Sequence, residues 1–151
     1  MTQVVSDIAP GSEIGPGDPL DDFVEVDRKL VLVVEDEPTL LEVMSFVLES
    51  EGFRVEVARN GEEALERLRT GMRPALVLLD LMMPVMSGRE FLDEIARSPA
   101  LASLPIVVLT AGGPPEVPGA AEVLPKPYDL ELLIEAVERH TRGRRASPRA
   151  R

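Results

Sequence analysis

A chain of 151 residues favours a single domain with tails, and its hydrophobic fraction of 44 % is ordinary for a globular protein. The chain has no cysteine, which excludes disulfides and thiolate metal sites, and its net charge of -11 argues against general nucleic-acid binding, which needs lysine and arginine to displace counterions. We expect a cytoplasmic protein, since the sequence shows neither a secretory signal nor an apolar run of membrane-spanning length.

The two ends of the chain have opposite charge, and neither has the apolar period of a folded element. Residues 1–27 combine glycine, proline and scattered carboxylates without a lysine or arginine, whereas residues 142–151 are basic. We predict a disordered acidic tail over 1–27, a folded domain over 28–141 and a basic flexible tail over 142–151. A partner-binding acidic arm, and a basic end that touches an anionic surface, are the functional alternatives.

Strands and helices are predicted to alternate in the first half of the domain. A β-branched apolar run over 29–34 precedes a helical pattern that begins near Pro38 and stops at Gly52. The alternating segment 53–58 then predicts a strand, followed by a helix over 60–71, where asparagine supplies the cap and glycine the stop.

The second half continues this alternation with two strongly apolar runs. Residues 74–79 and 105–109 are apolar on both faces, which is typical of central parallel strands. Between them, Ser87 and Glu90 form a capping-box pattern at the start of a helix. A short strand at 123–124 and a helical pattern over 130–137 complete the domain.

This order implies an α/β fold: a doubly wound, five-stranded parallel sheet of order 2-1-3-4-5, as in flavodoxin-like proteins. Ligands of such sheets bind beyond the carboxyl ends of the strands, where the strand order reverses, here between the first and third strands. Polar residues follow the apolar runs at these ends: Glu35, Asp36, Asp80, Thr110 and Lys126.

Three carboxylates brought together repel one another, so they persist most easily around a cation. An all-oxygen ligand set suits Mg²⁺. With the Lys126 ammonium and the Thr110 hydroxyl nearby, the site suits a phosphoryl group beside the carboxylate of Asp80, which can act as the nucleophile. Each signal alone has a structural explanation, as a helix-start charge or a turn residue. Polar residues at four strand ends together, namely the Glu35–Asp36 pair, Asp80, Thr110 and Lys126, favour a site.

Four segments resemble the response-regulator receiver family over roughly residues 28–141. They are VLVVEDEP at 31–38, LLDLMMPVMSG at 78–88, PIVVLTA at 105–111 and GAAEVLPKPY at 119–128. The resemblance implies that Asp80 accepts a phosphoryl group from a phosphohistidine of a sensor histidine kinase or phosphotransfer protein. It also implies an Mg²⁺ site formed by Glu35, Asp36, Asp80 and the backbone carbonyl of Met82.

Further roles follow from the same resemblance. Thr110 resembles the hydroxyl that turns toward the phosphoryl group, Lys126 resembles the lysine that pairs with it, and Pro127 resembles a cis-bonded proline. The chain is then not an enzyme beyond its own phosphorylation and slow dephosphorylation. We expect it to signal by protein–protein interaction with an unknown downstream protein, without a DNA-binding domain and without a membrane.

Three departures from the family pattern concern the output of such a domain. Thr110 and Lys126 are only 16 positions apart, and the glycine- and proline-rich segment 111–118 is a poor helix, so we predict that the fourth helix is absent or a single turn. Val123 stands where the family has its aromatic switch residue. Met82 lies at a position that tunes dephosphorylation in this family, and a thioether cannot hold water as a polar side chain can.

We therefore expect the phosphorylation chemistry to survive while the usual fourth-helix output face does not signal in the standard way. A pseudo-receiver that binds proteins without phosphate is the alternative, favoured by the shortened segment and Val123. A small phosphatase ranks last, because Leu81 and Met82 follow the nucleophile where a second acid would be needed. Tyr128 is expected to pack, and the only histidine, His140, to lie on the surface.

Overall fold

Five strands form one parallel sheet in the computed structural model, which describes residues 28–83, 85–112 and 116–142. The strands are β2 (Leu30–Val34), β3 (Arg54–Ala58), β4 (Leu76–Asp80), β5 (Ile106–Thr110) and β6 (Glu122–Pro125). Their order is β3-β2-β4-β5-β6, so the predicted order 2-1-3-4-5 is confirmed. The predicted tails, apart from Arg142, lie outside the described residues, and the proposed domain boundaries stay a prediction.

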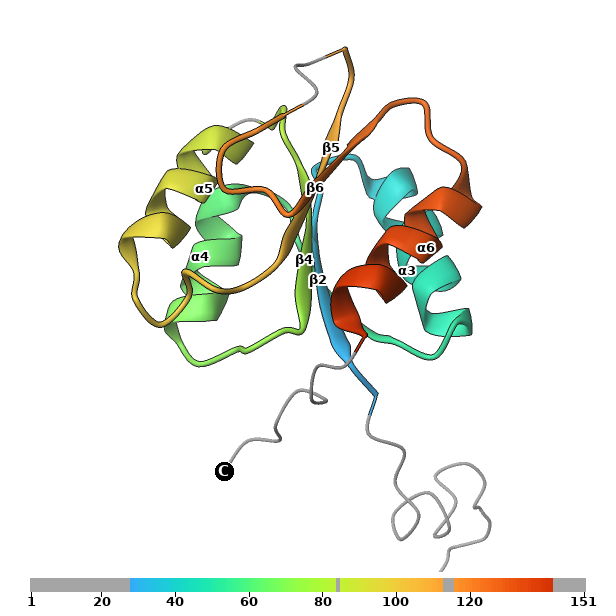
Figure 1. Ribbon diagram of the computed structural model, residues 1–151, viewed down its shortest axis with the longest axis horizontal. Helices are drawn as coiled ribbons and strands as arrows, with labels where there is room; N and C mark the ends of the chain where they lie inside the picture. The colour runs from blue at the N-terminus through green and yellow to red at the C-terminus, as the bar shows by residue number, and fades with distance from the viewer. Residues whose placement is uncertain (1–27, 84, 113–115, 143–151) are drawn as a thin grey trace, which may run out of the picture.

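Four helices cover the two faces of this sheet. They are α3 (Pro38–Ser50), α4 (Gly61–Arg69), α5 (Gly88–Arg97) and α6 (Leu130–Thr141). Figure 1 shows α3 and α6 on one face and α4 with α5 on the other, as expected for parallel strands joined by crossover helices. Within the described parts of the chain, no helix combines the length and the apolarity that crossing a bilayer requires.

Helices α3, α4 and α5 each begin at a side chain that accepts a free backbone amide, whereas α6 has no such side-chain cap. Glu37 accepts from the amide of Leu40 at 2.8 Å at the start of α3. At the start of α5, Ser87 accepts from the amide of Glu90, and Glu90 accepts from that of Ser87, so the predicted capping box is confirmed.

The core consists of two apolar layers separated by the sheet. The three central strands β2, β4 and β5 are buried along their whole length, as predicted for β4 and β5 from runs apolar on both faces. Alternate residues of β2 enter opposite layers: Leu32 packs on the side of Phe91 from α5, and Val33 on the side of Met44 from α3. This rigid sheet fixes the positions of its strand ends.

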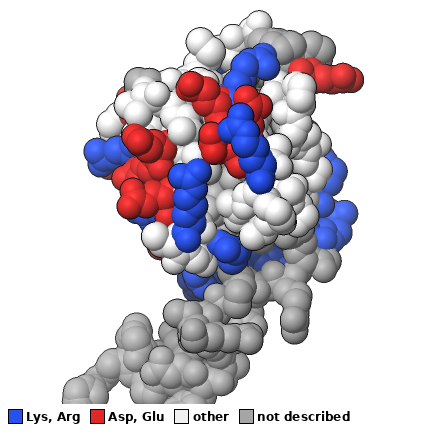
Figure 2. All heavy atoms as spheres, turned by 90° about the vertical axis from the view of Figure 1, so that its left-hand side faces the viewer, with Lys and Arg blue, Asp and Glu red and all other residues white. Residues whose placement is uncertain are grey.

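Charged side chains lie on the outer face of α4 and α5, where Figure 2 shows basic and acidic groups interleaved. Arg69 of α4 and Arg97 of α5 both approach Glu94, with N–O distances of 3.3 and 2.7 Å. Pairs as exposed as these contribute little to stability, so this face is best explained as a solvated surface.

The connection from β5 to β6 contains no helix among its described residues, 111–112 and 116–121. In place of a helix, Val117 is buried in the same apolar layer as Leu92 of α5, and its carbonyl accepts from the amide of Ala120 at 3.0 Å in a tight turn. The expected loss of the fourth helix is confirmed for the described residues, and a single buried valine covers part of the layer there.

Candidate functional site

The carboxyl ends of four strands bring the predicted polar residues to one edge of the sheet. Asp80 and Thr110 are the last residues of β4 and β5, while Glu35 follows β2 and Lys126 follows β6. The amide of Glu35 still bonds to the carbonyl of Ala58, and the amide of Lys126 to that of Thr110, so the backbone ladder extends to these residues. Their positions are therefore set by the sheet and not by free loops.

Three carboxylates form a cluster at this edge. One oxygen from each of Glu35, Asp36 and Asp80 lies within 4.8 Å of the others. Glu35 is 2 % exposed and Asp80 is 5 % exposed, whereas Asp36 is open to solvent. Two of the three acids are thus removed from water beside a like charge, which is costly unless a cation is close.

Lys126 supplies a positive charge to this cluster. Its Nζ lies 3.5 Å from Oδ1 of Asp80 and 3.8 Å from Oε1 of Glu35. At these separations the lysine neutralises part of the negative charge without a short hydrogen bond to either acid. Its side chain is about one quarter exposed (25 %), so the ammonium sits at the mouth of the site.

The remaining partners of the carboxylates are backbone amides. Glu35 Oε2 accepts from the amide of Glu37, and Asp80 Oδ1 accepts from the amide of Met82, each at 3.2 Å. Oε1 of Glu35 is buried and has no hydrogen-bond partner. An unpartnered buried carboxylate oxygen that belongs to a cluster of acids fits a cation ligand, and its hard oxygen chemistry fits Mg²⁺.

Burial raises the pKa of Glu35 to about 7. The charges of Asp80 and Asp36 contribute to this rise, while the amide of Glu37 and the Lys126 ammonium act in the opposite direction. Burial, together with Glu35 and Asp80, also raises the pKa of Tyr128. In the absence of a metal ion, Glu35 therefore holds its proton at a pH where an ordinary glutamate is ionised.

Comparison with known proteins identifies the family of the chain. The model of the response regulator receiver domain matches residues 31–138 of the chain. The chain belongs to the response regulator receiver family. The family is not enzymatic apart from its own phosphorylation, and the acidic cluster of this receiver is typical of the family's Mg²⁺ site.

Curated relatives and solved structures agree with this assignment. The receiver is 42 % identical over 125 residues to the transcriptional regulatory protein CpxR homolog of Haemophilus influenzae, covering 78 % of this chain and 52 % of that protein. It is 35 % identical over 126 residues to the phosphate regulon transcriptional regulatory protein PhoB of Escherichia coli, covering 80 % and 54 %. The chain thus spans about half the length of these relatives.

The solved structures with a similar fold include complete receiver domains. The signal receiver domain of a signal transduction histidine kinase from Syntrophus aciditrophicus superposes with a TM-score of 0.72 at 29 % identity, covering 82 % of this chain and 97 % of that one. The chemotaxis response regulator CheY4 of Vibrio cholerae gives a TM-score of 0.69 at 31 % identity, covering 75 % and 98 %.

Further residues that the sequence singled out, Val123, Tyr128 and Pro127, have defined environments. Val123 is half-buried and packs against the apolar layer under α4 and α5. Tyr128 packs against the opposite layer, as expected, and its hydroxyl donates to the sulfur of Met44 at 3.8 Å. The Lys126–Pro127 bond is cis, in agreement with the resemblance. The ligand role of the Met82 carbonyl and the phosphoryl contact of Thr110 stay predictions.

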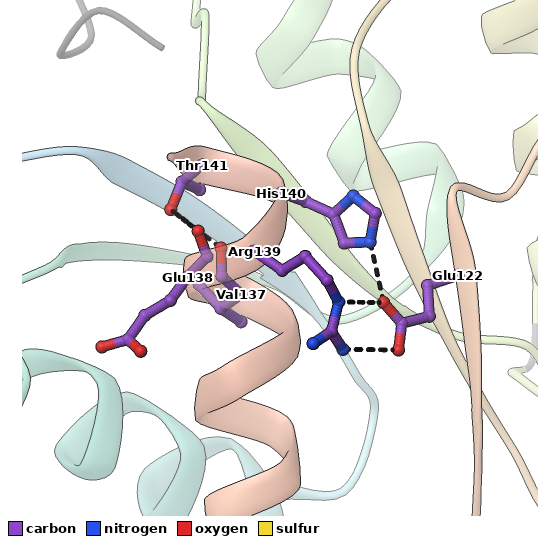
Figure 3. Close-up of polar contacts among 6 residues, drawn as sticks. All are labelled: Glu122, Val137, Glu138, Arg139, His140 and Thr141. Carbon is purple, nitrogen blue, oxygen red and sulfur yellow. Dashed lines mark hydrogen bonds and ion pairs between the residues drawn. The ribbon is translucent and has the colours of Figure 1, made fainter. Parts of the chain in front are cut away.

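One charged group at the amino end of β6, away from the site, was not singled out by the sequence. Glu122, the first residue of β6, accepts from Arg139 through both oxygens, at 3.2 and 2.8 Å, and its Oε1 lies 2.7 Å from Nε2 of His140 (Figure 3). The hydrogen bond from Arg139, more than that from His140, lowers the pKa of Glu122. His140 is thus half-buried and paired across to β6, and not simply a surface residue as predicted.

Val85, in the loop after Asp80, has a backbone conformation that a β-branched residue rarely adopts. Its φ is 70° and its side chain is largely exposed. The left-handed conformation costs an L-residue roughly 1–2 kcal/mol, whereas glycine adopts it freely but loses more entropy on folding. We expect Val85→Gly to raise the free energy of unfolding by about 1 kcal/mol in urea titrations.

Val43 offers a matched control for this substitution. It is also an exposed valine, but it lies inside α3, where glycine is unfavourable. Val43→Gly should lower the free energy of unfolding by up to about 1 kcal/mol. A loss of stability in both variants would contradict the strain assigned to Val85.

Proposed function

We propose that this receiver accepts a phosphoryl group on Asp80 from a phosphohistidine of a sensor histidine kinase or phosphotransfer protein. It then signals in the cytoplasm by binding a downstream protein. The observation that supports this most directly is the environment of Asp80: a buried carboxylate in a cluster of three acids with the Lys126 ammonium 3.5 Å away. Phosphoryl transfer requires this combination of positioning and charge neutralisation.

In the proposed step a carboxylate oxygen of Asp80 forms a bond to phosphorus as the nitrogen–phosphorus bond of the phosphohistidine breaks. The imidazole nitrogen leaves with the electron pair and takes a proton from solvent. Lys126 pairs with a phosphoryl oxygen, and Thr110, buried at the end of β5, turns its hydroxyl toward another. Mg²⁺ held by Glu35, Asp36, Asp80 and the carbonyl of Met82 would neutralise the charge on the transferred group.

A phosphorylation-independent protein-binding module is the second candidate. The described residues between β5 and β6 contain no helix, and Val123 stands where the resemblance to the family implies an aromatic side chain, so we expect an altered output face. The intact set of Asp80, Lys126 and the acidic cluster opposes this candidate, because such a module has no use for a buried carboxylate cluster.

The test is the intact mass of the protein after incubation with a small phosphodonor and Mg²⁺. We expect one added phosphoryl group on the native protein and none on Asp80→Asn, since the amide cannot act as the nucleophile. Chelation of Mg²⁺ should also abolish the adduct. Asp93→Asn, which changes an exposed aspartate of α5, is the matched control and should be phosphorylated as the native protein is.

Absence of an adduct on the native protein, in a fast-quenched assay and with a cognate kinase, would reject the phosphoacceptor proposal in favour of the binding module. NMR spectra before and after phosphorylation address the output separately. Spectral changes confined to the segment 116–123 and α6, which correspond to the usual fourth-helix output face, would contradict the expectation that this face does not signal in the standard way.

A further inference from the structure

The methionines of the described chain differ sharply in exposure. Met82 is 72 % exposed, whereas Met44 is 0 % exposed. Met72, Met83 and Met86 are half-buried and pack against the apolar layer under α4 and α5. A dissolved oxidant thus reaches the thioether of Met82 much more readily than the other four.

Met82 is also the methionine tied directly to the phosphoacceptor. Its amide donates to Oδ1 of Asp80 at 3.2 Å, and only Leu81 lies between the two residues. Leu81 is buried in the apolar layer, so the chain turns its next side chain outward, and Met82 stands at the rim of the site. A chemical change of this side chain occurs beside the carboxylate without disturbing the core.

We propose that Met82 is an oxidation site through which peroxide shortens the lifetime of the phosphoryl group on Asp80. The sulfur lone pair attacks one oxygen of hydrogen peroxide, the oxygen–oxygen bond breaks, and that oxygen is transferred to sulfur. Sulfur is oxidised by two electrons to the sulfoxide, and the remaining peroxide oxygen is reduced to water. The consequence for Asp80 rests on the proposed phosphoacceptor function.

The physical reason is a change in hydrogen bonding at the rim. A thioether is a weak acceptor and does not hold water, whereas a sulfoxide oxygen is a polar acceptor. Water held by the sulfoxide beside Asp80 is positioned to attack phosphorus and to break the bond between phosphorus and the carboxylate oxygen. We expect the half-life of phosphorylated Asp80 to shorten about fivefold, the size of one net hydrogen bond in the transition state.

The experiment has two independent readouts on the full chain. Peptide mass mapping after limited hydrogen peroxide treatment should find Met82 sulfoxide well before any oxidation of Met44, the buried internal control. The half-life of the phosphoryl group is then compared in untreated, oxidised and methionine sulfoxide reductase-treated protein, and reduction should restore the original half-life. In Met82→Leu the phosphoryl group on Asp80 should have the same half-life with and without peroxide. In Met82→Gln its half-life should be short even without peroxide.

Several results would overturn the inference. They are equal oxidation of Met82 and Met44, an unchanged half-life of the oxidised protein, or an equal peroxide effect in Met82→Leu. A phosphoryl adduct that forms on untreated protein but is insensitive to oxidation rejects the inference alone. Failure of untreated protein to form any adduct rejects the proposed function and the inference together.

Discussion

Without divalent cations, the free energy of unfolding should fall as pH rises from about 4.5 to above 7, and Glu35→Gln should remove most of this fall. Burial and the charge of Asp80 raise the pKa of Glu35 from 4.5 to about 7 in the folded protein. The folded state therefore holds a proton that the unfolded chain releases, and the associated stability is fully present below pH 4.5 and lost as pH passes 7. A shift of this size corresponds to about 3 kcal/mol.

Urea titrations in a chelating buffer at several pH values measure this effect. Glu35→Gln keeps the shape of the side chain and removes its charge, so the variant should exceed the native protein in stability at pH 8 and match it near pH 4.5. Glu49→Gln, which changes an exposed glutamate of α3, is the control and should keep the native pH dependence. A Glu35→Gln variant with the native slope would show that another group carries the proton.

Mg²⁺ should reverse this loss of stability. Metal ligands must be deprotonated, so a cation bound by Glu35, Asp36 and Asp80 competes with the proton on Glu35. The gain in melting temperature on adding Mg²⁺ should consequently be larger at pH 8 than at pH 5, and it should shrink in Glu35→Gln. An equal gain at both pH values would indicate that the cation binds away from this cluster.

The fold was largely predictable from the sequence, because apolar period and strand order act locally and reinforce each other. The runs over 74–79 and 105–109 are apolar on both faces, and only the centre of a parallel sheet buries such strands. Ser87 and Glu90 mark the start of α5 because the capping box is made by residues three apart. The absence of a fourth helix among the described residues of 111–118 followed from glycine and proline in this segment, for the same local reason.

The site was predictable as a set of residues but not as a set of environments. Glu35 and Asp36 are adjacent in sequence and both acidic, yet the structure buries Glu35 and exposes Asp36, since the amide of Glu35 continues the ladder to Ala58. The raised pKa of Glu35 depends on this burial and on Asp80, 45 positions away in the chain. No local pattern encodes it.

Two further features depend on contacts or strain that the sequence pattern does not carry. Glu122 meets Arg139 and His140 only after α6 packs beside β6, across 17 and 18 positions. The left-handed conformation of Val85 contradicts the preference of a β-branched residue, so residue type alone argued against it. In both places tertiary structure overrides the local preference.

At Gly88, the first residue of α5, we expect the addition of a single methyl group to have a large effect. A Cβ on Gly88 would lie 2.7 Å from Cα of Leu81, whose carbonyl also accepts from the amide of Gly88 at 3.0 Å. Backbone cannot move aside as a flexible side chain can, so Gly88→Ala should lower the free energy of unfolding by about 2–3 kcal/mol. Leu81 directly follows Asp80, so the same shift should displace the carboxylate from Lys126 and slow phosphorylation.

Gly61 is a matched control, because it is the first residue of α4 and is buried as Gly88 is. The nearest atoms to a Cβ at Gly61 belong to the side chain of Met86, with Cγ at 3.0 Å, and a methionine can change rotamer to make room. Gly61→Ala should therefore change stability by less than about 1 kcal/mol, because the helix propensity of alanine offsets the contact. Urea titration and the rate of Asp80 phosphorylation, measured on both variants, separate a general effect of alanine at a helix start from the backbone clash. Equal losses of stability in the two variants would assign the cost to alanine at a helix start. A loss of both stability and phosphorylation rate in Gly88→Ala alone would show that the contact of Gly88 with the Leu81 backbone keeps Asp80 in position beside Lys126.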